Sequence, residues 1–184
     1  MLVHFIGHPE VVIDPAAPIP RWRLSPQGID RMRGFADRLP RPDAIWASTE
    51  CKAIEAAGLL AGRHGLPVQV HPGLDENDRS ATGYLPPEAF QRAADRFFAE
   101  PEQSFRGWER AADAQQRIVA AWRAVTATPG RIAIIGHGGT GTLLFCALSG
   151  LPIDRRHDAG RQGCYWVWEP AAGGMVHGWR PLEE

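Results

Sequence analysis

The stretch Met1-Leu-Val-His-Phe-Ile-Gly-His-Pro-Glu10 is the most informative part of the sequence for the fold. Its apolar run, Leu2 to Ile6, contains β-branched and aromatic residues and is typical of a buried strand. Gly7 ends the run, and His8 follows at the carboxyl end of the predicted strand. Ligands bind at that edge in open α/β sheets. His8 is therefore a candidate functional residue.

A second segment repeats this layout far downstream. Arg131-Ile-Ala-Ile-Ile135 is an apolar run, and Gly136-His-Gly-Gly-Thr-Gly141 follows it before a helical pattern. A single histidine after a strand is more often a surface or capping residue. Two matching contexts support each other, because His8 and His137 meet at one edge if their strands are neighbours in one sheet.

Strands and helices alternate along the rest of the chain. Helical periodicity and stop signals predict helices over residues 26–39, 50–64, 87–99, 108–126 and 140–149, and apolar or alternating runs predict further strands at 44–47, 68–70, 163–169 and 175–179. This order predicts one domain over residues 1–184, an α/β three-layer sandwich whose mostly parallel central sheet is flanked by helices. Ala171-Ala-Gly-Gly174 predicts a C-terminal antiparallel hairpin.

The composition is that of an ordinary globular protein. The 184 residues are 44% hydrophobic and 22% charged, and the net charge of -1 argues against a nucleic-acid binder. No apolar run approaches the length of a membrane span, and no secretory leader is visible. The three cysteines are odd in number and widely spaced, as in a reduced cytoplasmic protein. The tryptophans of the final hairpin suit a homodimer surface and an apolar core equally well.

The two histidine segments resemble the motifs of the histidine phosphatase (phosphoglycerate mutase-like) superfamily. The family signature is strand-Arg-His-Gly-Glu near the start and strand-x-His-Gly-Gly near the end, and the resemblance covers about residues 2–150. It implies that His8 attacks phosphorus and carries the phosphoryl group. It implies also that His137 holds phosphate oxygens, and that Glu76 of Leu74-Asp-Glu76 protonates the leaving oxygen, with Asp78 as a second candidate for the acid. No cofactor and no metal are expected.

The chain departs from the family pattern at its cations. The first-motif arginine is replaced by Gly7 and the glycine after the histidine by Pro9. The second arginine, in a Ser-x-x-x-Arg-Ala segment, is replaced by Lys52, the only lysine of the chain. Lysine keeps the charge and loses the planar two-pronged donor set of arginine. Loss of one charged donor from a transition state costs about 3 kcal/mol.

Other groups in the sequence supply candidates for phosphate binding. Arg79 lies three residues after Glu76, in the polar and irregular segment 72–87. Arg21 and Arg23 lie in the proline-rich loop after the first motif, and each arginine alone is more often a surface charge. Gly138 and Gly139 directly precede the helix predicted at 140–149, whose N-terminus can bind an anion, so Gly138 is a further candidate.

These features predict a metal-independent phosphoric monoester hydrolase that uses a phosphohistidine intermediate on His8. A neutral imidazole is a competent nucleophile near pH 7. Its substrate would be a small-molecule phosphate ester or a phosphoprotein, and a phosphohistidine-protein phosphatase is one alternative. A second alternative is a catalytically impaired, phosphate-ester-binding or regulatory protein, which the missing arginine favours. The glycines of residues 136–141 lack the spacing of a dinucleotide site.

Overall fold

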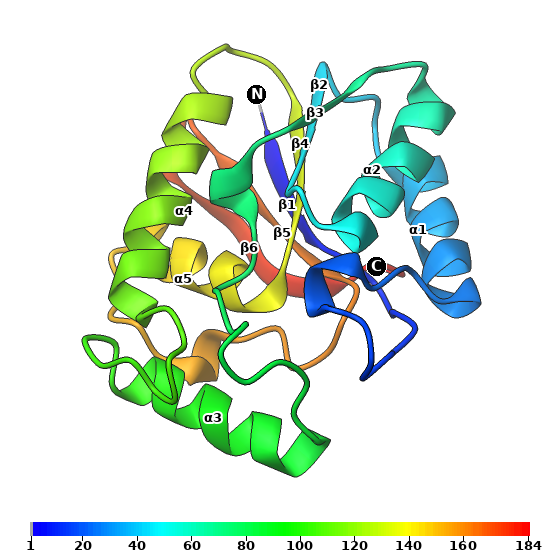
Figure 1. Ribbon diagram of the computed structural model, residues 1–184. Helices are drawn as coiled ribbons and strands as arrows, with labels where there is room; N and C mark the ends of the chain where they lie inside the picture. The colour runs from blue at the N-terminus through cyan, green and yellow to red at the C-terminus, as the bar shows by residue number, and fades with distance from the viewer. Residues whose placement is uncertain (1) are drawn as a thin grey trace.

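Six strands form a single mixed sheet in the order β3-β2-β4-β1-β5-β6 in the computed structural model, which describes residues 2–184 (Figure 1). The strands are Val3–Gly7 (β1), Ala44–Ala47 (β2), Val68–Val70 (β3), Ile132–Gly136 (β4), Cys164–Glu169 (β5) and Gly174–Pro181 (β6). β1 to β4 run parallel, whereas β5 and β6 are antiparallel to their neighbours. The predicted mostly parallel sheet and its terminal hairpin are confirmed.

Helices cover both faces of the sheet. They are Pro26–Arg38 (α1), Cys51–His64 (α2), Pro87–Ala99 (α3), Ala111–Val125 (α4) and Gly138–Leu148 (α5), with 3-10 turns at Ile19–Arg21 (η1), Pro72–Leu74 (η2) and Arg155–His157 (η3). Figure 1 shows α1 and α2 on one face and α4 and α5 on the other, with α3 below the carboxyl ends of the strands. The arrangement confirms the three-layer prediction.

β1 and β4 are direct neighbours, as the two histidine segments predict. Their register places Gly7 opposite Gly136. The backbone N–H of His8 donates to the carbonyl oxygen of Gly136 at 3.0 Å, so pairing continues just past the strands. Consequently His8 and His137 leave the sheet at the same level.

Helix α5 packs closely on the sheet behind this edge. A Cβ atom at Gly141 would lie 2.4 Å from the Phe5 ring, closer than any real contact. Glycine at this position therefore lets the N-terminal turn of α5 approach β1. The close approach brings the free N–H groups of that turn to the carboxyl edge of the sheet.

Two helix starts differ from the prediction by more than one residue, whereas Ser25 caps α1 through the N–H of Gly28 as its position suggests. The helix predicted from residue 108 begins at Ala111. The segment before it is held by the loop of residues 78–82, because Glu109 N–H donates to the Asp78 carbonyl and the Trp108 indole donates to Thr82. The other difference is α5, which starts two residues earlier than predicted.

No helix of residues 2–184 is long and apolar enough to cross a membrane.

Candidate active site

The imidazoles of His8 and His137 face each other at the carboxyl edge of the sheet. Their ring centroids are 5.2 Å apart and their planes are inclined by 72°. The loops after β1, β2 and η2 and the N-terminus of α5 surround them. This is the edge at which the sequence places the candidate site.

His8 is oriented by its own backbone. Its Nδ1 lies 2.8 Å from the carbonyl oxygen of Pro9, and since a carbonyl only accepts, Nδ1 carries the hydrogen. The neutral ring then has its lone pair on Nε2. Burial, together with His137 and Lys52 nearby, lowers the pKa of His8 to about 3. The ring is therefore neutral near pH 7, which suits a nucleophile.

His137 is almost fully buried, with 1% of its surface exposed. Its Nε2 lies 2.7 Å from Ser48 Oγ, whereas its Nδ1 has no hydrogen-bond partner within residues 2–184. Burial lowers the pKa of His137, although the nearby Glu50 carboxylate acts in the opposite direction. A buried nitrogen without a partner is costly unless a ligand satisfies it.

Lys52 lies at this site but is not free. The side chain is 2% exposed, and its ammonium donates to the carbonyl oxygen of Ile19 at 3.0 Å and to the Glu50 carboxylate. The two residues form a buried ion pair on the first turn of α2. The cation that the sequence offers to phosphate therefore already has an anionic partner.

Glu50 is itself buried, with 7% of its surface exposed. Its Oε1 accepts the backbone N–H of Glu76 at 3.0 Å and lies 3.5 Å from His137 Nε2. Burial alone would raise the pKa of Glu50, but His137 and Lys52 outweigh it and lower this pKa to about 2. Glu50 is thus an ionised carboxylate at the centre of the site.

Glu76 faces the N-terminus of α5. Its carboxylate accepts the backbone N–H of Gly139 at 3.2 Å and that of Thr140 at 2.9 Å. It lines the cavity next to His8, as a leaving-group acid would. Asp78, the second candidate for the acid, is exposed; its bond with Ser80 lowers its pKa, and it lines a different cavity.

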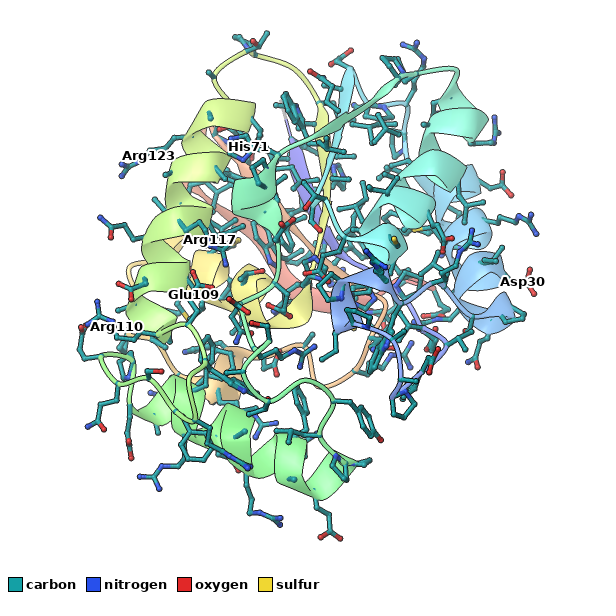
Figure 2. All side chains as sticks on the ribbon, viewed as in Figure 1. Asp30, His71, Glu109, Arg110, Arg117 and Arg123 are labelled. Atoms are coloured by element: carbon teal, nitrogen blue, oxygen red, sulfur yellow. The ribbon has the colours of Figure 1, made fainter. Side chains whose placement is uncertain are left out.

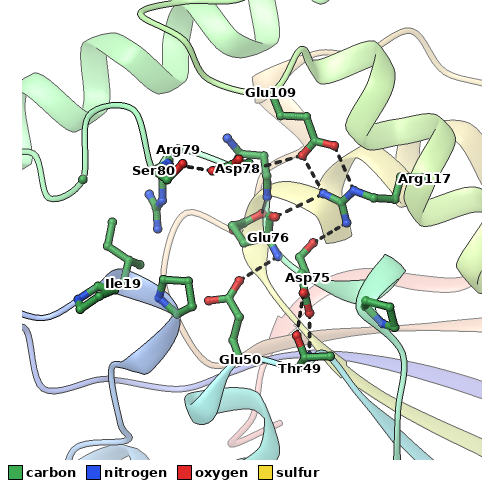
Figure 3. Close-up of a pocket in the computed structure, with 15 residues that line it drawn as sticks. Ile19, Thr49, Glu50, Asp75, Glu76, Asp78, Arg79, Ser80, Glu109 and Arg117 are labelled. Atoms are coloured by element: carbon green, nitrogen blue, oxygen red, sulfur yellow. Dashed lines mark hydrogen bonds and ion pairs between the residues drawn. The ribbon is translucent and has the colours of Figure 1, made fainter.

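Arg117 of α4 holds the Glu76 segment in place. Its guanidinium donates to the carbonyl oxygens of Gly73, Asp75 and Glu76 at 3.1, 3.0 and 3.2 Å, and it pairs with Glu109 at 2.7 Å. Figure 2 shows the side chains of Arg117 and Glu109 close together beside α4, and Figure 3 shows their bonds to the 75–78 segment.

Of the three predicted arginines, Arg79 is the one placed at the cavity of His8. It lines the same cavity as His8, and its guanidinium stands over the Phe90 ring at 4.9 Å from the centroid. No ion pair engages Arg79 within residues 2–184. Arg21 lines a separate cavity that contains neither histidine, and Arg23 pairs with Glu55 there.

Two cavities adjoin the site. One, of about 350 Å³, contains His8, Gly138, Glu76 and Arg79. The other, of about 640 Å³, contains Glu50, and Glu76 and Arg79 line it as well (Figure 3). Gly138 is the first residue of α5, and its N–H has no partner among the described residues. An anion beside His8 would therefore meet a free N–H group and the Arg79 cation.

Among residues 2–184, no three histidine, cysteine or carboxylate side chains are placed to hold a metal ion.

Glu50 and Arg117 are the site residues that the sequence reasoning missed. Glu50 lies two residues before the only lysine, at the start of a helix, which is a signal for a local ion pair. Arg117 belongs to a helix whose apolar stripe is evident, but nothing in its neighbourhood indicates contacts with residues 73–76. That pairing joins positions more than forty residues apart.

The chain matches a family model described as the histidine phosphatase superfamily (branch 1) over residues 19–174. The match begins after His8. The assignment of His8 to the site therefore rests on its position in the structure and not on the family match. No curated protein matches the chain.

Solved structures share the fold at low sequence identity. A mycobacterial glucosyl-3-phosphoglycerate phosphatase in complex with inorganic phosphate has a TM-score of 0.82 at 17% identity, covering 100% of this chain and 99% of that one. A phosphoserine phosphatase of Entamoeba histolytica with 3-phosphoglyceric acid has a TM-score of 0.79 at 15% identity, covering 100% and 99%. YhfR of Bacillus stearothermophilus has a TM-score of 0.79 at 21% identity, covering 96% and 94%.

Proposed function

Because the chain belongs to branch 1 of the histidine phosphatase superfamily, we propose that it is a phosphomonoesterase that acts through a phosphohistidine intermediate on His8. The observation that carries the proposal is the state of His8. Its Nδ1 hydrogen is bound to Pro9, its pKa is far below neutrality, and its Nε2 has the free lone pair that attack on phosphorus requires.

In the first step, Nε2 of His8 attacks phosphorus while the bond between phosphorus and the ester oxygen breaks. The Glu76 carboxyl group gives its proton to the departing oxygen, so an alcohol leaves. The bonds of Glu76 to Gly139 and Thr140 hold the carboxyl group beside the cavity of His8. Arg79 and the N–H of Gly138 would stabilise the phosphoryl oxygens.

In the second step, water attacks the phosphohistidine. Glu76, now a carboxylate, takes a proton from the water as the oxygen bonds to phosphorus and the bond to His8 breaks. Inorganic phosphate leaves, and both residues return to their first state. His137 would hold a phosphoryl oxygen throughout, since its buried Nδ1 has no partner among the described residues. The substrate would be a small phosphate ester, as the names of two similar structures indicate for those proteins, or a phosphoprotein.

A second candidate is a phosphate-ester-binding protein without turnover. The buried pairing of Lys52 with Glu50 favours it, because both family arginines are then missing as free cations. The retained pair of His8 and Glu76 weighs against it, since binding alone requires neither a nucleophile nor an acid.

The test measures hydrolysis of a generic aryl phosphate by the wild type and by His8→Ala, in the presence of a metal chelator. Turnover that survives chelation and disappears in His8→Ala supports the phosphohistidine route. Acid-quenched enzyme should then carry labelled phosphate on histidine.

Two other results oppose this proposal. If wild type and His8→Ala are equally inert while inorganic phosphate raises the melting temperature, the binding protein stands and the phosphatase fails. If neither turnover nor a phosphate effect is found, both candidates fail.

A further inference from the structure

A buried carboxylate engages Lys52, the cation at the second phosphate-holding position of the family. Glu50 receives hydrogen bonds from the Lys52 ammonium and from the backbone N–H of Glu76, and its Oε1 lies 3.5 Å from His137 Nε2. Lys52 and His137 are the residues that replace or match the phosphate-holding positions of the family. The proposed mechanism does not use Glu50.

The pairing of Glu50 with Lys52 changes the charge that a bound phosphate would meet. Lys52 contributes one positive charge, and Glu50 cancels it across a buried ion pair. Lowered pKa values keep both histidines neutral near pH 7, and Arg79 has no carboxylate partner among the described residues. A phosphate ester entering the site therefore meets one unpaired cation, Arg79, and a second only when the Glu50 carboxylate releases Lys52.

The structure also places Glu50 at the border of a cavity. Glu50 lines the cavity of about 640 Å³ between η1 and the loop after η2. Figure 3 shows its side chain directed from the start of α2 toward the Glu76 segment, at the border of this cavity. The Glu50 carboxylate therefore lies between the Lys52 ammonium and open space.

We propose that Glu50 is an affinity-determining residue, an internal anion that competes with the substrate phosphoryl group for Lys52. The inference rests on the proposed function, since it concerns the phosphate of that reaction. The inference gives a role to Lys52, which stands at the position of the family's second arginine in a chain that lacks the first. The lysine is held in place by an anion of the protein until phosphate displaces that anion.

The test measures binding of inorganic phosphate and of orthovanadate by isothermal titration at pH 7. Four proteins are compared: wild type, Glu50→Gln, Glu50→Ala and Glu55→Gln. Glu50→Gln keeps the size and removes the charge, and Glu50→Ala keeps the test available if the glutamine variant folds poorly. Glu55→Gln is the matched control, because it removes the same charge from a position within α2, where the carboxylate binds the exposed Arg23 and the backbone N–H of Leu24. Far-ultraviolet circular dichroism verifies that each variant is folded.

Removal of the competing charge should tighten phosphate binding by roughly ten- to a hundredfold in both Glu50 variants, since charged hydrogen bonds are exchanged. The Glu55→Gln control should bind like wild type. Equal or weaker binding in the Glu50 variants overturns the inference and gives Glu50 a positioning role, while wild-type turnover through His8 would still uphold the proposed function. Absence of phosphate binding in all four proteins also overturns it, and the His8→Ala comparison then decides the proposed function separately.

Discussion

The ring of His8 meets the ring of His137 edge to face, with centroids 5.2 Å apart. The contact follows from the pairing of β1 with β4, which places Gly7 opposite Gly136 and sends both histidines off the same edge. Each ring has a lowered pKa, so the two lie together without charge repulsion near pH 7. In the proposed mechanism, the pair supplies the nitrogen of His8 that attacks phosphorus and the unpartnered nitrogen of His137 that holds a phosphoryl oxygen.

Replacement of Glu76 should affect substrates according to their leaving groups. In Glu76→Gln the proton donor is gone, so kcat/KM for an alkyl phosphate, whose leaving oxygen needs a proton, should fall by about a hundredfold or more. An aryl phosphate with an acidic leaving group should lose much less. Steady-state kinetics with both substrates measures the contrast.

Asp78→Asn is the matched control for this prediction, because Asp78 is an exposed carboxylate in the same loop. It should leave both substrates unaffected. Equal losses for alkyl and aryl phosphates in Glu76→Gln would contradict a role as general acid and would indicate a structural role at the N-terminus of α5.

Arg79 should be the arginine that supports phosphate binding. It lines the cavity of His8, whereas Arg21 lines a different cavity. We expect Arg79→Ala to lower kcat/KM for an aryl phosphate by about a hundredfold, as removal of a charged donor does. Arg21→Ala should retain wild-type kinetics. A loss in Arg21→Ala alone would show that the proline-rich loop, rather than the 72–87 segment, supplies the cation.

His4 should make the protein sensitive to mild acid. The side chain is 7% exposed, and burial, with Arg131 and His177 nearby, lowers its pKa to about 4. The unfolded chain therefore binds more protons at this residue between pH 4 and 6.5, and stability falls as the pH drops through that window. Because of His4, the free energy of unfolding should be about 2 kcal/mol lower at pH 4.5 than at pH 7.

Urea denaturation of wild type and His4→Leu at several pH values measures this cost. The difference between the two proteins should change between pH 7 and 4.5 and stay constant between pH 7 and 8. A parallel loss of stability in both proteins would assign the acid sensitivity to other groups.

Most of the fold could be predicted because its signals are local. Periodicity and capping residues such as Ser25 mark the elements, and the repeated strand-Gly-His pattern pairs β1 with β4. The start of α4 could not be predicted in this way. The sequence pattern includes Trp108 in the helix, but its indole donates a hydrogen bond to Thr82 in a distant loop. No pattern of neighbouring residues predicts such a contact.

The candidate site could be predicted for residues that come directly after a strand or a short turn. His8, His137 and Glu76 lie together because a strand or a short turn ends beside each of them. Lys52 was predicted as a phosphate-binding cation, and the structure pairs it with Glu50. Side-chain geometry decides such a pairing, since a glutamate two residues away can equally point to solvent.

Restoration of the missing arginine at Gly7 should not by itself restore a phosphate-binding cation. A Cβ at Gly7 would lie 3.4 Å from the Cys164 carbonyl oxygen and 3.7 Å from the Trp179 ring, which are ordinary contacts. Gly7→Ala should therefore be as stable as wild type. A longer side chain at position 7 meets Trp179, whose ring packs edge-on against Phe5 with the ring centroids 6.1 Å apart. Gly7→Arg should therefore lower the free energy of unfolding by about 1–3 kcal/mol.

Thermal denaturation measures these stabilities, and titration with phosphate measures the function of the new arginine. We expect Gly7→Arg to bind phosphate no better than wild type, and the double variant Gly7→Arg with Trp179→Ala to bind it more tightly, because the indole no longer fills the space. Trp179→Ala alone is the control for the loss of packing. Tighter binding by Gly7→Arg without loss of stability would mean that Trp179 moves aside and does not exclude an arginine from the first motif.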